Sequence, residues 1–243
     1  MIKIDTPHPG LSVHEVLGGS ERDLDDLLAI HRELFAKFSS YIPFMVERAK
    51  DPPDADPRFV EHWWLARIDG KPAGIRYFKY VPVRHCGLSL GIAVLKPYRH
   101  LTFGRYGRFS KLLTLTSLEQ LRADAKAAGQ PVPVGIVAEV EDYLLPRYDE
   151  YDFIRLTVDY NEPSSTPEAS AARGENTGDH LSFRPIQIGV FKLADTQFDP
   201  FNRQMLRDMV LAFLVDHYSL PDDHPMVRRA LESIQDMPEA KDD

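Results

Sequence analysis

Residues 86–140 constrain the fold most, because they run through an apolar segment, a helical pattern and a second apolar segment. The segment CGLSLGIAVL at 86–95 predicts a buried strand. Apolar residues then recur at three- to five-residue spacing, which predicts a helix over about 105–128 that stops at Gly129. The segment VPVGIVAEV at 132–140 predicts another strand. A strand–helix–strand unit implies a parallel pair of strands, so we expect an α/β fold.

The segments before this unit predict antiparallel pairing. Strands at 62–70 and 71–83 meet at Asp69-Gly70, which is a strong hairpin signal. Residues 20–38 carry an amphipathic pattern with Ser20 at the N-cap position, and this predicts the first helix. Antiparallel strands beside a parallel pair give a mixed sheet flanked by helices.

The C-terminal part of the chain predicts shorter elements and then additional helices. The expected elements are a short helix at 143–153, strands at 154–160 and 183–193, a flexible loop at about 161–180, and helices at 200–218 and 224–236. We therefore expect one domain over residues 1–195 and a C-terminal helical extension over residues 196–243.

Composition excludes several classes of protein. The net charge of −8 argues against a general nucleic-acid binder, although a local basic site is compatible with it. No apolar run reaches the length of a membrane helix and no apolar signal core opens the chain, so we expect a cytoplasmic protein without a membrane partner. The single Cys86 fits a reducing compartment, and the histidines lack metal-ligand spacing. A homodimer is left open.

The connection between the first apolar strand and the helix is basic and contains glycine. Arg99 and Gly104 stand at the two ends of RHLTFG, which follows an apolar pair, a proline and an aromatic residue. The unpaired N–H groups at a helix start carry about half a positive charge, so a turn of this kind suits a phosphate group. The alternative is a plain strand–helix connection, and this motif alone leaves both open.

A second motif lies on the short helix after the 132–140 strand, where Tyr148 is followed five residues later by Phe153. Together the two motifs and the order of elements resemble the GCN5-related N-acetyltransferase (GNAT) superfamily, over about residues 20–195. Two positions depart from the family pattern, because Thr102 and Asp152 stand where the family has glycine.

The resemblance implies a fold and a co-substrate. The fold is a GNAT-like mixed sheet whose central strands splay at one end, with the additional helices of this chain at the C-terminus. Acetyl-CoA or another acyl-CoA is the implied co-substrate, with its diphosphate at the basic turn and its thioester arm along the end of the preceding strand. The residues implied to bind it are Ala93, Val94, Leu95, Arg99, His100, Leu101, Thr102, Phe103, Gly104 and Arg105.

The resemblance also implies a mechanism. In the family, an amine attacks the thioester carbonyl directly, and a tyrosine on the later short helix protonates the departing thiolate. The position of Tyr148 on that helix implies that it is this acid. A phenol is mostly protonated at physiological pH, so it can donate a proton. The family often has a glutamate on the strand before the phosphate turn, but residues 87–93 contain none. Glu139 and Glu141 on the neighbouring strand, or His85, are the substitutes by location, and water is a further alternative.

Three functions are compatible with these residues. The leading expectation is an acyl-CoA-dependent N-acyltransferase, transferring an acetyl group to an amine of a small molecule or peptide. The first alternative is a non-catalytic acyl-CoA-binding module, in which Tyr148 is a plain surface residue. The second is a long-chain N-acyltransferase related to acyl amino acid or acyl-homoserine lactone synthases.

Overall fold

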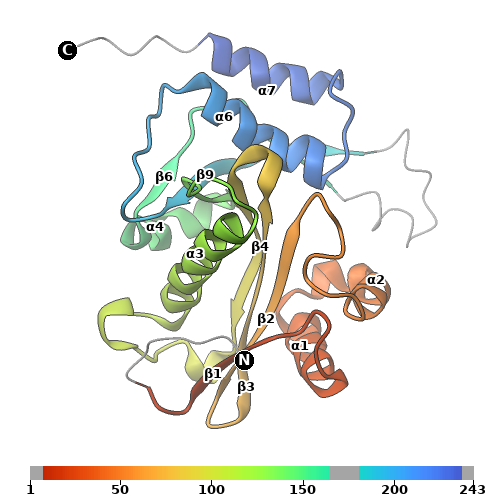
Figure 1. The fold of residues 1–243 in the computed structure, drawn as a ribbon, viewed down its shortest axis with the longest axis vertical. Coiled ribbons are helices and arrows are strands. Elements are labelled where there is room, and N and C mark those ends of the chain that lie inside the picture. The colour runs from red at the N-terminus through yellow and green to blue at the C-terminus, as the bar shows by residue number, and fades with distance from the viewer. Residues whose placement is uncertain (1–7, 165–180, 237–243) are drawn as a thin grey trace. The chain divides into compact units, whose positions relative to one another are not determined.

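The structure is a computed structural model that describes residues 8–164 and 181–236. Seven strands are hydrogen-bonded in the order β1-β2-β3-β4-β5-β9-β6, and β7 pairs with β8 in a second sheet. Figure 1 colours the elements in chain order. Helices accompany the strands, so the α/β class expected from the sequence is confirmed. The predicted neighbours β4 and β5 are adjacent in this order.

The bounds of the regular elements are as follows. The strands are β1 (Leu11–Glu15), β2 (Val60–Ile68), β3 (Lys71–Val81), β4 (Cys86–Val94), β5 (Gly135–Val140), β6 (Phe153–Arg155), β7 (Asn161–Pro163), β8 (Phe183–Pro185) and β9 (Gln187–Lys192). The helices are α1 (Glu21–Leu34), α2 (Ile42–Arg48), α3 (Phe109–Ala127), α4 (Leu145–Tyr148), α6 (Arg203–Leu211) and α7 (Pro225–Gln235), and a π-helix spans Ala212–His217.

The chain divides into two units, which we call the first and the second unit. The first contains residues 1–79 and 89–120, and the second contains residues 80–88 and 121–243. Most of the predicted loop at 161–180 lies outside the described residues. The expected domain boundary near residue 195 stays a prediction.

The start of α1 follows from its cap. The Ser20 hydroxyl accepts a hydrogen bond from the Asp23 N–H at 3.2 Å, as the sequence predicts. The helix ends at Leu34, before the predicted end, and a 3₁₀ helix continues over Ala36–Tyr41. Three aromatic residues follow at the three-residue spacing that suits a 3₁₀ helix, and their rings contact one another in order: Phe35, Phe38 and Tyr41.

The hairpin between β2 and β3 forms as predicted. Asp69 and Gly70 both have positive φ, at 49° and 75°, which is the geometry of a tight hairpin turn. The sequence analysis missed β1, which pairs antiparallel with β2 from Leu11 opposite Ile68. A five-residue strand carries little periodic signal, and its partner lies far along the chain.

Helix α3 begins later than predicted and ends where predicted. It starts at Phe109 rather than near residue 105, because Gly107 has a φ of 66° that a helix does not allow. The Phe109 ring is buried and anchors the first turn. At the other end, Gly129 also has positive φ, and the Gln130 N–H reaches back to the Ala125 carbonyl at 2.8 Å.

The C-terminal elements are more divided than the sequence predicts. Only β6 forms within the predicted 154–160 strand, because Asp159 is bound instead by Ser233 and Arg229 of α7. The predicted 183–193 strand separates into β8 and β9, and the predicted 200–218 helix changes from α6 into the π-helix.

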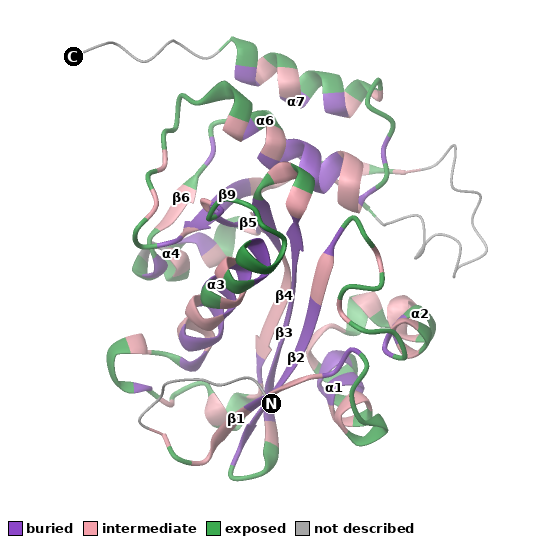
Figure 2. Ribbon diagram, viewed as in Figure 1, coloured by how far each residue is buried: buried purple, intermediate pink, exposed green. Residues whose placement is uncertain are grey.

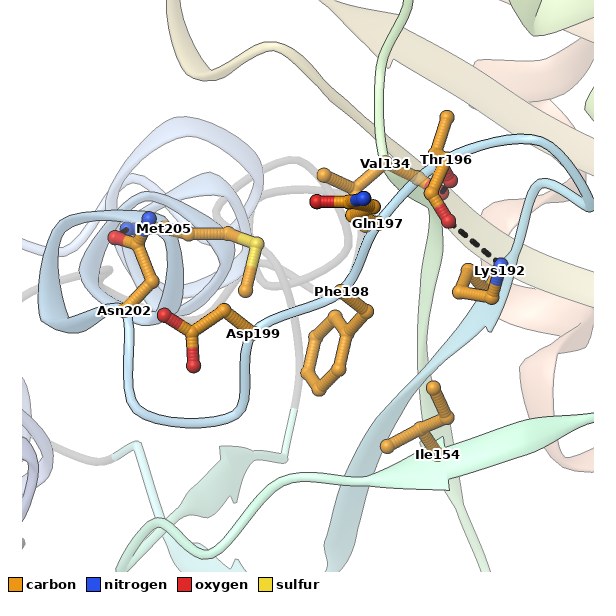
Figure 3. Close-up of a pocket in the computed structure, with 9 residues that line it drawn as sticks. All are labelled: Val134, Ile154, Lys192, Thr196, Gln197, Phe198, Asp199, Asn202 and Met205. Carbon is orange, nitrogen blue, oxygen red and sulfur yellow. Dashed lines mark hydrogen bonds between the residues drawn. The ribbon is translucent and has the colours of Figure 1, made fainter. Parts of the chain in front are cut away.

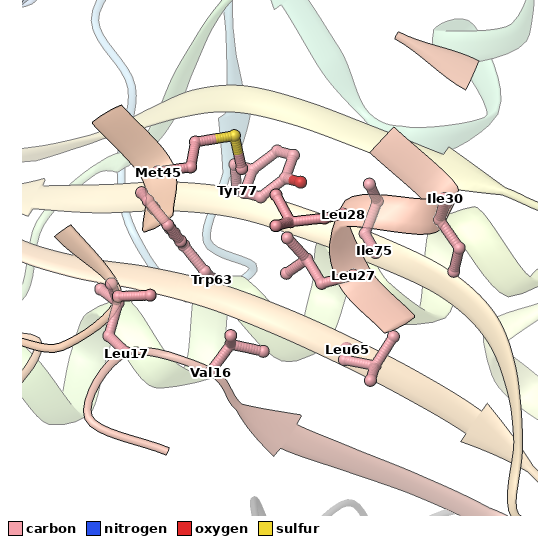
Figure 4. Packing of buried hydrophobic residues seen from close by; sticks show 11 residues of the cluster. Val16, Leu17, Leu27, Leu28, Ile30, Met45, Trp63, Leu65, Ile75 and Tyr77 are labelled. Carbon is pink, nitrogen blue, oxygen red and sulfur yellow. The ribbon is translucent and has the colours of Figure 1, made fainter. Parts of the chain in front are cut away.

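The first unit has its own apolar core. One face of β2 and β3 packs against side chains of α1 and α2 (Figure 4), which explains the amphipathic pattern of α1. The residues of this cluster are Val16, Leu17, Leu27, Leu28, Ile30, Met45, Ala49, Trp63, Leu65, Ile75 and Tyr77. Trp63 and Trp64 are both buried and, as strand neighbours, face opposite sides of the sheet.

Two adjacent strands differ in burial. Strand β3 is buried from Ala73 to its end, whereas residues 89–93 of β4 are half-buried (Figure 2). The guanidinium of Arg76, only 1% exposed, lies beside this part of β4. It donates to the Ser89 hydroxyl at 2.7 Å and to the Gly91 carbonyl at 3.3 Å. A second nitrogen donates to the Ser117 hydroxyl of α3 at 3.3 Å. Arg76 therefore ties β4 to α3 at the point where β4 is least covered.

We predict that Arg76→Lys lowers the free energy of unfolding by about 2–3 kcal/mol, because one ammonium cannot replace a planar fork that serves several buried acceptors. Urea denaturation measures this. Arg22→Lys, on the exposed surface of α1, is the matched control and should change stability by less than about 0.5 kcal/mol. Equal effects of the two substitutions would contradict the role given to Arg76.

Candidate functional site

The loop between β4 and α3 is a concentration of positive charge. From residue 95 to residue 118 the chain has five lysine or arginine residues and no acidic residue, although its net charge is −8. Lys96, Arg99, Arg105 and Arg108 are all exposed. The segment is therefore a cationic surface on an acidic protein, and such a surface attracts anions.

The main chain of this loop is folded into a turn of its own. The Phe103 N–H donates to the Gly107 carbonyl at 2.7 Å, and the N–H groups of Tyr106 and Gly107 donate to Phe103 and Gly104. Gly104 has a φ of 54°, so a β-branched residue there is strained whether or not a ligand binds. These N–H groups are used within the turn, so the loop offers an anion mainly its side chains and the start of α3.

The implied coenzyme A residues take different places in this loop. His100, Thr102, Gly104 and Arg105 are exposed and Leu101 is half-buried. Phe103 is instead a core residue, 1% exposed, with its ring 4.9 Å from that of Phe109.

The end of β4 is fixed from both sides. The Arg99 Nε donates to the Val94 carbonyl at 2.8 Å, which fastens the loop to the strand. The Leu95 N–H donates to the Ala73 carbonyl at 2.9 Å and is therefore occupied. Ala93 is half-buried and Val94 is buried. His85 lies in the turn just before Cys86, the first residue of β4.

Tyr148 belongs to an aromatic cluster in the second unit. Its ring centroid lies 5.1 Å from that of Phe191 on β9, in an edge-to-face arrangement, and 5.8 Å from that of Phe153. Tyr151 completes the cluster at 5.5 Å. The spacing of Tyr148 and Phe153 thus corresponds to a real contact. Packing fixes the ring, as a proton donor requires.

Glu139 is the most unusual carboxyl group among the predicted site residues. It projects from β5, is half-buried, and accepts one hydroxyl on each oxygen. The Tyr160 hydroxyl donates to Oε1 at 2.5 Å, and the Tyr218 hydroxyl donates to Oε2 at 2.8 Å. Both tyrosines are buried.

Its surroundings raise the pKa of Glu139 to about 8. Burial is the main cause, because it penalises the charged form, and the negative charge of Glu162 adds to it. The hydroxyls of Tyr160 and Tyr218 and the charge of Arg184 act in the opposite direction and lower the pKa. A carboxyl group with a pKa near physiological pH is suited to accept and release a proton.

Glu141, the other predicted base, has a simpler environment. It lies just beyond β5, and its carboxylate is 2.8 Å from the Arg184 guanidinium. The same guanidinium also pairs with Glu162 of β7. The Glu141 carboxylate is therefore held by a cation, whereas each oxygen of Glu139 accepts a neutral hydroxyl group.

Glu139 and Tyr148 lie on opposite faces of the β5–β9 pair. Glu139 is opposite Ile188, whereas Phe191, which contacts Tyr148, is opposite Ile136. Cross-strand partners share a face, and residues three apart along a strand do not. The two candidate groups therefore need separate tests.

The sequence analysis missed Tyr160 and Tyr218. Neither belongs to a recognisable spacing, and both reach Glu139 through long-range folding. An isolated tyrosine at the end of an apolar helical segment is the sole sequence signal for Tyr218, and it does not indicate a partner.

A cavity of about 760 Å³ in the second unit is separate from these groups (Figure 3). The side chains and main chain that line it are Val134, Ile154, Lys192, Thr196, Gln197, Phe198, Asp199, Asn202 and Met205. The Lys192 ammonium donates to the carbonyls of Leu193, Ala194 and Thr196, so it serves the chain itself. None of the predicted site residues lines this cavity.

Two further features concern membranes and metals. No helix in residues 8–164 or 181–236 has both the length and the apolar character needed to cross a bilayer. Within the same ranges, no group of three or more His, Cys, Asp or Glu side chains is arranged to hold a metal ion.

Comparison with known proteins finds similarity in structure. Protein-family models give no match to the sequence, and curated protein sequences give none. Among solved structures, the chain is similar to an acetyltransferase from Streptococcus agalactiae, with 13% identity and a TM-score of 0.46 over 76% of this chain and 99% of that one. It is similar to an N-acetyltransferase from Staphylococcus aureus, with 14% identity and a TM-score of 0.44 over 75% and 98% of the two chains.

A third similar structure is a GNAT family acetyltransferase from Elizabethkingia anophelis, solved with acetyl-CoA bound. It has 14% identity and a TM-score of 0.40 over 76% of this chain and 99% of that one. All three similarities are similarities in structure at low sequence identity.

We predict that Glu139 makes stability depend on pH between its ordinary pKa of 4.5 and about 8. The raised pKa means that the folded chain binds this proton more tightly than the unfolded chain, so stability falls as pH rises through that window. Glu139→Gln removes this dependence, and its stability relative to the natural chain should rise with pH. Urea denaturation at about pH 5 and about pH 9 measures the difference.

Glu141→Gln is the control for this experiment, because it removes a neighbouring carboxyl group that is ion-paired. The same pH trend in both variants would contradict the assignment. Carboxyl NMR provides a direct check, because a glutamate resonance titrating near pH 8 should vanish in Glu139→Gln.

Proposed function

We propose that the chain is an acyl-CoA-dependent N-acyltransferase that transfers an acetyl group from acetyl-CoA to an amine of a small molecule or peptide. The observation that carries the proposal is the cationic loop from Lys96 to Arg108, which leads into a helix of 19 residues. A diphosphate suits such a place, because it pairs with the arginine side chains and with the positive end of the helix. The half-buried middle of β4 precedes the same loop.

Acyl transfer needs one proton removed from the nitrogen and one given to the departing sulfur. The thioester supplies the acyl carbon, to which the amine nitrogen bonds as the carbon–sulfur bond breaks. Glu139 accepts the proton that the nitrogen loses, and water protonates the departing sulfur. Tyr148 lies on the other face of the β5–β9 pair, so its phenol is tested separately, as the proton donor to the sulfur in a site on that face. A base with a pKa of about 8 gives a rate that rises with pH up to that value.

We predict that Arg105→Ala weakens coenzyme A binding about tenfold or more, because a charge-assisted hydrogen bond contributes about 1.5–3 kcal/mol. Arg99→Ala should weaken binding at least as much, since Arg99 also fastens the loop to Val94. Calorimetry with coenzyme A measures both affinities. Arg22→Ala, on exposed α1, is the control for loss of one positive charge. Unchanged affinity in both loop variants would contradict the proposal that this loop binds the diphosphate of coenzyme A.

The activity test is release of free coenzyme A thiol from acetyl-CoA in the presence of a panel of amines. We predict release by the natural chain, and a fall of about 10²–10⁴-fold in Tyr148→Phe with little change in acetyl-CoA affinity. This substitution keeps the ring in its cluster and removes only the donor. A loss of affinity with turnover intact would make Tyr148 a packing residue.

The same assay separates the alternative functions. Binding of coenzyme A without thiol release from any thioester would establish a non-catalytic module. Faster release from long-chain thioesters than from acetyl-CoA would establish the long-chain acyltransferase.

A further inference from the structure

We infer that the C-terminal helical segment is part of the catalytic apparatus, and that Tyr218 at its end is a positioning residue that orients the Glu139 carboxylate and favours its ionised form. Tyr160 does the same from the opposite oxygen. The inference rests on the proposed role of Glu139 as the base, and it gives the additional C-terminal helices a function.

The two hydroxyl groups fix the orientation of the carboxylate. Each oxygen of Glu139 accepts one hydroxyl, from Tyr160 and Tyr218, so rotation of the carboxyl group breaks both bonds. Burial and the negative charge of Glu139 hold the pKa of Tyr160 well above its usual value, so this hydroxyl stays a donor. Donation to the charged form favours that form, and it opposes the effect of burial.

The position of Tyr218 depends on the π-helix before it. The Tyr218 N–H donates to the Phe213 carbonyl at 2.8 Å, five residues back, as in a π-turn. The Tyr218 ring also contacts the rings of Phe213 and His217. π-helical turns are rare in proteins, and those that interrupt α-helices are often found at functional sites.

An ion-pair cluster fixes this π-helix in the second unit. Arg84, in the connection between β3 and β4, donates to Asp216 at 2.7 Å and lies 3.5 Å from Asp208 of α6. Asp216 is two residues before Tyr218. The attachment thus holds the hydroxyl-bearing end of the segment, and it uses a connection that is distant from Tyr218 in sequence.

Charged groups and hydroxyl groups both act on the pKa of Glu139. Glu162 of β7 raises the pKa of Glu139, and Arg184 of β8 lowers it, but Arg184 is shared with Glu141 and Glu162. The two tyrosine hydroxyls are the neutral donors that bind Glu139 directly. Loss of either one should therefore move the titration of Glu139 to higher pH.

The decisive variant is Tyr218→Phe, which keeps the ring and removes one donor. Carboxyl NMR should show Glu139 titrating about one pH unit or more above its value in the natural chain. The pH profile of thiol release from acetyl-CoA should move upward by the same amount, so that the lost rate returns at high pH. Tyr160→Phe removes the donor to the other oxygen, and it should also raise the pH at which Glu139 titrates. Tyr143→Phe, at a tyrosine that is 73% exposed, is the control and should change neither profile.

The outcomes separate this inference from the proposed function. An unmoved Glu139 titration in both Tyr218→Phe and Tyr160→Phe, with both variants folded, would overturn the inference even if the enzyme is active. A lower rate without a shift in pH profile would make Tyr218 a merely structural residue. Absence of thiol release by the natural chain would overturn the proposed function, while the NMR titration would still decide whether Tyr218 sets the protonation of Glu139.

Discussion

The hydrogen bonds of Arg76 are the constraint on which the middle of the sheet depends. A guanidinium that is almost fully buried has lost its contacts with water, and here its Nε and one terminal nitrogen donate to Ser89, Gly91 and Ser117. The consequence is that β4 is held by a side chain over the residues that are only half-buried. A central strand can thus remain partly uncovered without becoming loose, and the loop after it starts from a fixed position.

Local signals predicted local structure well. The Ser20 cap, the Asp69-Gly70 turn and the Gly129 helix end each depend on neighbouring residues, and each forms as predicted. The spacing of Phe35, Phe38 and Tyr41 was ambiguous, since three-residue steps fit a 3₁₀ helix as well as an α-helix.

Long-range contacts account for what the sequence could not predict. Strand β1 gains its structure from β2, and the 157–160 segment leaves the sheet for α7, which no local pattern encodes. Glu139 and Glu141 look equivalent in sequence, two positions apart. In the folded chain, Glu139 accepts hydrogen bonds from two tyrosine hydroxyls, whereas Glu141 pairs with an arginine. The surroundings of the two carboxyl groups therefore differ only in three dimensions.

The π-helix has a consequence for how this chain can vary during evolution. A π-turn holds one residue more than an α-turn between the same donor and acceptor. Loss of one residue between Phe213 and Tyr218 would therefore leave the Tyr218 N–H bonded to the Phe213 carbonyl, now four residues back as in an α-helix. The direction of the Tyr218 side chain would be kept, and the side chains between the two residues would be redirected. The length of this segment can thus differ by one residue among related chains that keep the hydrogen bond to Glu139.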